Sequence, residues 1–315
     1  MNIANKTISV ISPFYNEESG VESFFSRLKE VHDKIADRYN LEVIAINDGS
    51  KDSTLSKLIG VKPLYPFLTI VDLSRNFGKE AALSAGLDYA TGDIVVPIDS
   101  DLQHPPELIL DMLAKWEEGF EVVLAKRIDR DTDRAIQKLS ANSFYKFHNY
   151  ISDIDIPADV GDFRLMDRKV VEALKALPEN RRFMKGLFAW VGFKTTAVEY
   201  KVEPRLNGVT SFNTWKLWNF ALEGITSFSS APLRVWSYLG GIISFLSLLY
   251  AFYLIIKTVV LGIDTPGYAS LMVAILFVGG IQLIGIGVLG EYLGRIFVET
   301  KRRPVYIVRE VIGRE

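Results

Sequence analysis

The sequence predicts an α/β protein with a doubly wound, mostly parallel sheet, followed by a two-helix transmembrane hairpin. Over the first hundred residues, short runs of apolar β-branched residues alternate with segments whose apolar residues recur every three or four positions. Such alternation favours a parallel sheet with helices on both faces. Further along, residues 235–294 contain only three charged residues, Lys257, Asp264 and Glu291, as expected of helices that span a membrane.

The expected elements follow in order along the first part of the chain. Four strands, each ending in polar or turn residues, are expected at 8–14, 41–47, 67–73 and 93–98. Apolar periodicity predicts helices between them at 21–39, 52–59 and 79–90. A helix at 107–118, which the preceding proline pair can open, and a strand at 121–125 come next.

The overall composition excludes several classes of protein. The 315 residues are 49% hydrophobic and 23% charged, and their mean hydropathy is +0.16. These values rule out a disordered or collagen-like chain, and the lack of cysteine rules out a disulfide framework and thiolate chemistry. The net charge of −2 gives no reason to expect a nucleic acid as partner.

Two apolar stretches, 235–261 and 268–293, are each long enough to cross about 30 Å of hydrocarbon as helices. Lysine and arginine residues flank the pair but are absent from the turn at 262–267, so the positive-inside rule places both termini in the cytosol. The polar N-terminus gives no signal peptide, which also favours a cytosolic globular part. Glycines along the second stretch predict a homo-oligomer. Buried helices of a large soluble core are the alternative to a hairpin.

These features divide the chain into four expected parts. Residues 1–211 form the cytosolic globular domain, 212–232 an interfacial amphipathic helix, 233–294 the two transmembrane helices and 295–315 a cytosolic C-terminal tail. The interfacial helix is expected because aromatic residues form a stripe along 212–229 directly before the hairpin. An ordinary helix that faces the core is the alternative.

Polar residues collect at the expected ends of the first four strands. Asn16-Glu17, Asp48, Arg75-Asn76 and Asp99 each follow a different strand. Ligands in doubly wound sheets bind beyond the carboxyl ends of the strands. One cleft is therefore expected to contain all four segments.

Two of these segments have residue types that suit a nucleotide and a metal. Asp99 and Asp101 are one residue apart, so they can jointly hold a hard divalent cation that also bridges phosphate oxygens, and Gln103 can add a ligand. The alternative is a turn in which Asp101 caps the next helix. Asp48 can accept hydrogen bonds from a base or a ribose, whereas Asp52 or Ser50 can serve simply as a helix cap.

Five motifs occur in a fixed order, at 13–18 (PFYNEE), 47–52 (NDGSKD), 74–79 (SRNFGK), 99–106 (DSDLQHPP) and 161–165 (GDFRL). Together with 182–190 (RFMKGLFAW) and the hairpin, this set resembles the family-two inverting glycosyltransferases, and within them the polyprenyl-phosphate glycosyltransferases. The resemblance covers essentially the whole chain. It implies a nucleotide-sugar transferase A-type fold and the inverting transfer of one hexose to polyprenyl (undecaprenyl) phosphate at the cytosolic membrane face. UDP-glucose is favoured as donor, with GDP-mannose as the alternative.

The resemblance also implies roles for particular residues. The donor would be bound by Pro13, Glu17, Asp48, Arg75 and Asp99. Mg²⁺ or Mn²⁺ would be held by Asp99, Asp101 and Gln103, and Asp101 and Asp162 would be catalytic. The acceptor would be bound by Arg164, Arg205, Thr210 and Ser211. Ser211 stands where the family usually has a lysine, and candidates to replace that charge are Arg127, Arg130, Arg134, Lys138 and Lys146.

The expected chemistry needs no strong base. A phosphate monoester, with a second pKa of about 6, is largely dianionic at neutral pH and can attack the sugar directly. Asp162 is therefore expected to orient groups or to stabilise cationic character on the sugar, and His104 and His148 are interpreted as structural or surface residues. Two other functions stay open: a processive polysaccharide synthase, and a non-enzymatic membrane scaffold or nucleotide-sensing module.

Overall fold

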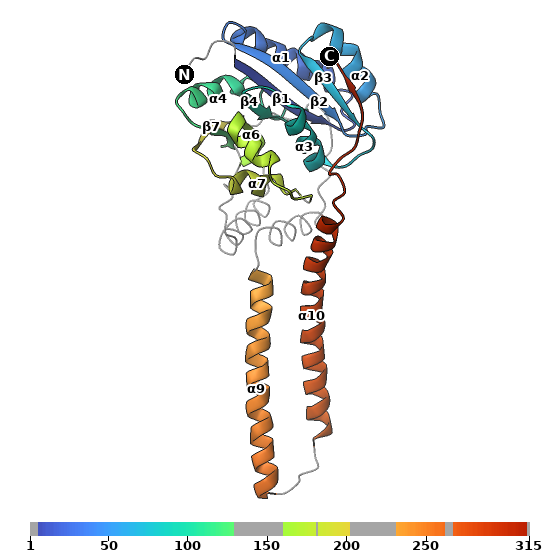
Figure 1. The fold of residues 1–315 in the computed structure, drawn as a ribbon, viewed down its shortest axis with the longest axis vertical. Coiled ribbons are helices and arrows are strands. Elements are labelled where there is room, and N and C mark those ends of the chain that lie inside the picture. The colour runs from blue at the N-terminus through green and yellow to red at the C-terminus, as the bar shows by residue number, and fades with distance from the viewer. Residues whose placement is uncertain (1–5, 129–159, 181, 202–230, 262–266, 314–315) are drawn as a thin grey trace.

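The computed structural model describes residues 6–128, 160–180, 182–201, 231–261 and 267–313 of the chain (Figure 1). Across these ranges, one eight-stranded sheet has the strand order β7-β5-β6-β4-β1-β2-β3-β8. The strands are β1 (Lys6–Phe14), β2 (Tyr39–Asn47), β3 (Leu68–Leu73), β4 (Ile94–Pro97), β5 (Val122–Arg127), β6 (Val160–Asp167), β7 (Thr195–Tyr200) and β8 (Val308–Ile312). β6 runs antiparallel to β4 and β5, and β8 antiparallel to β3, while the other neighbours are parallel.

The predicted α/β fold is confirmed, and the first four helices lie between strands as expected, whereas the last two of this part were not predicted. They are α1 (Val21–Ile35), α2 (Thr54–Val61), α3 (Lys79–Tyr89), α4 (Leu108–Glu117), α6 (Arg168–Lys175) and α7 (Met184–Trp190). The helix expected to reach residue 39 was predicted too long. The N–H of Arg38 donates to the carbonyl of Ile35 at 2.9 Å in a turn, and the buried Tyr39 begins β2.

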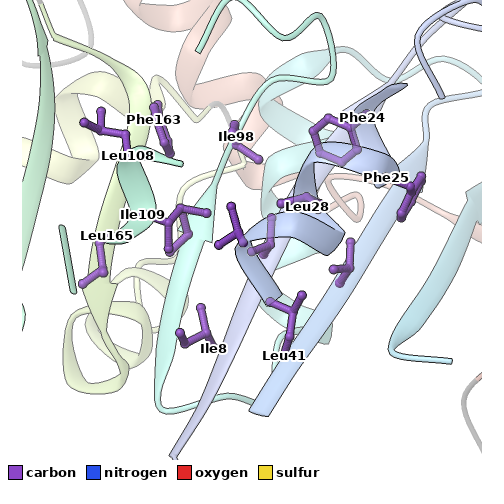
Figure 2. Packing of buried hydrophobic residues seen from close by; sticks show 14 of the residues in the cluster. Ile8, Phe24, Phe25, Leu28, Leu41, Ile98, Leu108, Ile109, Phe163 and Leu165 are labelled. Carbon is purple, nitrogen blue, oxygen red and sulfur yellow. The ribbon is translucent and has the colours of Figure 1, made fainter. Parts of the chain in front are cut away.

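Alternation along the strands builds a core on each face of the sheet. Ile8 and Val10 of β1 point into the cluster formed with α1, α2 and α4, whereas Ile11 points into the cluster formed with α3, α6 and α7. Figure 2 shows Phe24 and Leu28 of α1 packed over the sheet in the first cluster. Each such side chain contributes about 1.5–3 kcal/mol on burial. This packing holds the strand ends, and hence the loops after them, in fixed positions.

The segment expected as a C-terminal tail returns to the sheet. β8 pairs with β3 at its edge, with Ile312 opposite Ile70 and Val308 opposite Leu73. Just before β8, the hydroxyl of Tyr306 donates to the carboxylate of Asp88 on α3 at 2.7 Å. The residues after the last helix therefore join the globular part.

Two long helices, α9 (Ala231–Leu261) and α10 (Tyr268–Thr300), extend together from one end of the globular part (Figure 1). They have 31 and 33 residues, or about 45–50 Å at 1.5 Å per residue. Their apolar side chains are exposed, 80% at Val259 and 71% at Leu283. Within the described ranges, one segment, Phe277–Thr300, is long and apolar enough to cross a membrane. Residues 212–230 of the expected interfacial helix and residues 262–266 of the expected turn lie outside the described residues, while residues 231 and 232 begin α9.

Candidate active site

The loops after β1, β2 and β4 meet where the carboxyl ends of these parallel strands form one edge of the sheet, as predicted from the sequence. The N–H of Asp48 donates to the carbonyl of Phe14 at 2.9 Å, and the hydroxyl of Ser100 donates to the carbonyl of Pro13 at 3.0 Å. The N–H of Glu17 donates to the hydroxyl of Thr54, the first residue of α2, at 2.9 Å. The structure therefore brings the expected donor residues from three loops together.

This edge of the sheet lies on the side of the long helices. The N–H of Ser74, directly after β3, donates to the carbonyl of Ile307 at 2.9 Å. Ile307 comes seven residues after Thr300, where α10 ends. The loop that carries Arg75 is thus bonded to the chain as it leaves α10.

The loop after β2 is locked against the loop after β3. Asp48 is 3% exposed, and its carboxylate accepts hydrogen bonds from the N–H groups of Phe77 at 2.7 Å and Gly78 at 3.0 Å. Burial raises the pKa of Asp48, although these two donors oppose the shift. Gly49 has a φ of +61°, and a Cβ there would lie 2.3 Å from the carbonyl carbon of Arg75, so only glycine fits.

Asp99 and Asp162 face one another across a lysine. The Nζ of Lys79, the first residue of α3, lies 2.7 Å from Oδ1 of Asp99 and 2.7 Å from Oδ2 of Asp162. The antiparallel register that pairs β4 with β6, Ile94 opposite Asp167, brings Asp162 level with Asp99. Burial alone would raise the pKa of Asp162, but the ammonium of Lys79 and other nearby cations hold it below its usual value. Asp162 is therefore ionised at neutral pH.

Asp101 and Gln103 form a tight turn beside this pair. Oδ1 of Asp101 accepts a hydrogen bond from the N–H of Gln103 at 3.1 Å. Between them, Leu102 has a φ of +57°, a conformation that is costly for a leucine. In the alternative reading, Asp101 caps the following helix, but α4 begins after Glu107 without a side-chain cap. Its carboxylate instead accepts the hydrogen bond of this turn, two residues after Asp99.

Asp99, Asp101 and Asp162 are referred to below as the acidic group. His104 lies closer to this group than its interpretation as a structural residue implied. Its Nδ1 is 2.6 Å from the hydroxyl of Tyr200, at the end of β7, and its Nε2 is 3.7 Å from Oδ2 of Asp99. Its ring also packs at 5.5 Å against Phe163. Burial lowers the pKa of His104. His104, paired with Tyr200, therefore lies near Oδ2 of Asp99, while Lys79 contacts Oδ1.

Arg164 lies on β6 two residues after Asp162 and on the same face of the sheet. It is buried, and its Nη2 donates to the carbonyl of Gly161 at 2.8 Å. Its guanidinium stacks 3.8 Å from the ring centre of Phe188 on α7. Burial lowers the pKa of Arg164 to about 10, so it remains a cation at neutral pH. With Lys185 it lines a cavity of about 160 Å³ that otherwise has mainly apolar walls.

Glu80, next to Lys79, connects α3 to α7. Its carboxylate accepts a hydrogen bond from the N–H of Met184 at 3.2 Å. Burial, together with the charge of Asp162, raises the pKa of Glu80 to about 8.

Some predicted residues lie outside the described ranges, and some contacts were not foreseen. The residues outside the described ranges are Arg205, Thr210, Ser211, His148 and the candidate cations between 129 and 159. The contacts that were not foreseen are those of Lys79 and Tyr200. Lys79 ends a motif singled out from the sequence, but no local signal places its ammonium between two carboxylates.

The acidic group fits a divalent cation. Among the residues that the structure describes, no three His, Cys, Asp or Glu side chains form a ready metal site. Mg²⁺ and Mn²⁺ bound to nucleotides, however, need only one or two carboxylates, since phosphates supply other ligands. Asp99 and Asp162 already enclose one cationic group, and Oδ1 of Asp162 is buried without a hydrogen-bond partner. These oxygens could accept bonds from a metal or a ligand.

Comparison with known families agrees with this fold. The model of the family described as "Glycosyl transferase family 2" matches residues 9–175, which span β1 to α6, and the "GtrB C-terminal hairpin" model matches residues 231–296. The protein is therefore a glycosyltransferase. It belongs to glycosyl transferase family 2, as the ordered motifs predicted.

Relatives match over nearly the full length of the chain. The "Prophage bactoprenol glucosyl transferase homolog" of Escherichia coli is 50% identical, covering 96% of this chain and 99% of the relative. The "Bactoprenol glucosyl transferase" of Shigella phage SfV is 51% identical, covering 96% and 98%. A solved structure of glucosyl-3-phosphoglycerate synthase from Mycobacterium tuberculosis, in complex with Mn²⁺, UDP and phosphoglyceric acid, is similar at a TM-score of 0.49 and 23% identity, covering 70% of this chain and 76% of that one.

Proposed function

We propose that this protein transfers one hexose, with glucose from UDP-glucose as the first candidate, to the phosphate of a polyprenyl lipid with inversion at the anomeric carbon. The observation that carries the proposal is the acidic group at the sheet edge that faces the long helices. A soluble donor and a lipid phosphate can meet only where a cleft opens beside a bilayer. The bactoprenol glucosyl transferase names of full-length relatives support the same lipid and sugar.

On the donor side, the loop residues position a nucleoside diphosphate sugar. Pro13, Glu17, Asp48 and Arg75 line the nucleotide end. Asp99, Asp101 and Gln103 would hold Mg²⁺ or Mn²⁺, which neutralises the charge that develops on the departing diphosphate. Asp48 keeps the two nucleotide loops together, because its carboxylate is bonded to the N–H groups of Phe77 and Gly78.

On the acceptor side, the phosphate attacks as a dianion and needs no strong base. Asp162 is ionised, so it is suited to stabilise cationic character on the sugar and to orient the reacting groups. Arg164 and Lys185 supply positive charge beside it. Arg205, Thr210 and Ser211 complete the proposed acceptor site.

The long helices support a reaction at the cytosolic face of a membrane. The exposed apolar surfaces of α9 and α10 support an integral anchor, and the basic residues that flank the hairpin support cytosolic termini. Glycines along α10 support contacts between copies of the chain in a homo-oligomer.

The test is a donor screen on the purified full chain in detergent. UDP-glucose and GDP-mannose are supplied separately with Mg²⁺ or Mn²⁺ and undecaprenyl phosphate, and the lipid product is identified by mass. We expect the mass of one hexose from UDP-glucose, and a loss of about 100-fold or more in rate for Asp99→Asn and Asp101→Asn. Asp111→Asn, an exposed carboxylate on α4, is the matched control.

Three outcomes would overturn parts of the proposal. A product from GDP-mannose alone would replace the donor. A long polymer would indicate a processive synthase. No product with either donor would favour a scaffold or a nucleotide-sensing module.

A further inference from the structure

Lys79 carries a positive charge at a position where its helix does not favour one. It is the first residue of α3, and the N-terminal end of a helix attracts negative charge. Its side chain is 44% exposed, so neither burial nor the helix explains where its ammonium lies. The explanation lies in its two contacts of 2.7 Å with Asp99 and Asp162.

Those carboxylates need a cation when the site holds no substrate. Asp99 and Asp162 are brought together by the sheet register and are 26% and 11% exposed, so water screens them only in part. Asp101 adds a third carboxylate two residues from Asp99. Arg164 lies two residues after Asp162 on β6, and its Nη2 is bonded to the backbone carbonyl of Gly161. Lys79 is thus the cation that contacts Asp99 and Asp162 together.

We propose that Lys79 occupies the place of the divalent cation before the donor binds and releases Asp99 when that cation arrives with a nucleoside diphosphate. The inference rests on the metal-dependent reaction proposed above. A lysine ammonium on a flexible four-carbon stem has three donors and can turn without moving the helix. It can therefore keep Asp162 and exchange Asp99 for a phosphate oxygen.

Metal binding and nucleotide binding are coupled as a consequence. A metal ion that arrives alone must displace the ammonium from Asp99 and leaves it without a new partner. A diphosphate supplies that partner, so the nucleotide strengthens metal binding, and by reciprocity the metal strengthens nucleotide binding.

The experiment measures Mn²⁺ bound to the purified full chain by electron paramagnetic resonance, with and without UDP. Lys79→Met removes the competing charge, so we expect Mn²⁺ alone to bind about tenfold more tightly than to the wild type. The strengthening of Mn²⁺ binding by UDP should shrink by a similar factor. Lys79→Arg keeps the charge and should stay close to the wild type. Lys169→Met is the matched control, because its ammonium pairs with Glu121 outside the acidic group.

Other outcomes of this experiment would overturn the inference. Unchanged or weaker Mn²⁺ binding by Lys79→Met would do so, because it would mean that Lys79 does not compete with the metal or only orients Asp99. If that variant folds poorly, Lys79→Met/Asp162→Asn removes the repulsion between carboxylates and must still bind Mn²⁺ more tightly than Asp162→Asn alone. Hexose transfer that persists in EDTA, with no Mn²⁺ bound, would overturn the inference and leave the transferase function standing. The expected Mn²⁺ results without lipid product from any donor would support the inference and reject the function.

Discussion

The pair formed by Arg309 and Asp72 tests whether the C-terminal strand stabilises the protein. Asp72 on β3 is 1% exposed, and its Oδ1 accepts a hydrogen bond from the side-chain amide of Asn47 at 2.7 Å. Its Oδ2 lies 3.2 Å from Nη1 of Arg309 on β8, and Nη2 of Arg309 donates to the carbonyl of Ser74 at 2.7 Å. Arg309→Met keeps the aliphatic stem and removes both contacts.

The expected loss follows from these contacts. A hydrogen bond to a charged group contributes about 1.5–3 kcal/mol. Because the Arg309 side chain is 58% exposed, solvent screening puts this contact at the low end of that range. With the bond to Ser74, we expect the free energy of unfolding to fall by about 2 kcal/mol. For a domain of about 150–250 residues this lowers Tm by about 4–8 °C.

The assay is thermal unfolding of the purified full chain in detergent, followed by circular dichroism. Arg38→Met is the matched control, because Arg38 is 56% exposed but pairs with a carboxylate, Glu117, that is 25% exposed. Its loss should lower Tm much less, since surface pairs contribute little. Equal shifts for Arg309→Met and Arg38→Met would refute the reasoning, because burial of Asp72 would then make no difference.

Three further predictions concern the site. Gly49→Ala should lower the free energy of unfolding by at least about 2 kcal/mol and abolish UDP binding measured by calorimetry, because its Cβ would lie 2.3 Å from backbone in a left-handed conformation. Its control is Gly60→Ala in α2, which has open space around it and should not destabilise the chain. Tyr200→Phe removes the hydroxyl that lies 2.6 Å from Nδ1 of His104 and should raise the Mn²⁺ concentration for half-maximal transfer about tenfold. The control is Tyr39→Phe, because the hydroxyl of Tyr39 donates to Glu117 at 2.6 Å. Equal effects of the two substitutions would exclude a role of Tyr200 in the site. The pKa of Glu80 is raised from 4.5 to about 8, so the native state keeps a proton that the unfolded chain loses, and the contribution of Glu80 to stability falls as pH rises across that window. The Tm of Glu80→Gln relative to the wild type should therefore rise between pH 5 and 8, and a constant difference would contradict this.

Local patterns in the sequence predicted much of the fold. Alternating apolar runs located β1 to β5 and the helices between them, because burial on a sheet or helix face requires a characteristic spacing. The shared carboxyl end of the parallel strands predicted that Glu17, Asp48 and Asp99 would lie in one cleft. Hydrogen bonds between the loops that carry them show that these loops meet. The error at the end of α1 arose because an apolar Tyr39 continues a helical spacing as readily as it begins a strand.

Other parts of the fold were absent from any local pattern. β6 lies between β4 and β5, and β8 pairs with β3 from the far end of the chain. Neither placement follows from spacing, because pairing between distant strands depends on which edges the rest of the fold leaves open.

The sequence by itself determined the class of fold, the family and the residue types at the strand ends, because periodicity and ordered motifs are properties of neighbouring residues. Only the tertiary structure decided that Asp162 lies level with Asp99, that Lys79 lies between them and that Tyr200 reaches His104. These contacts join residues 20 to 96 positions apart. Their geometry depends on strand register. Moving one strand by a single residue would turn the side chains of that strand to the opposite face of the sheet.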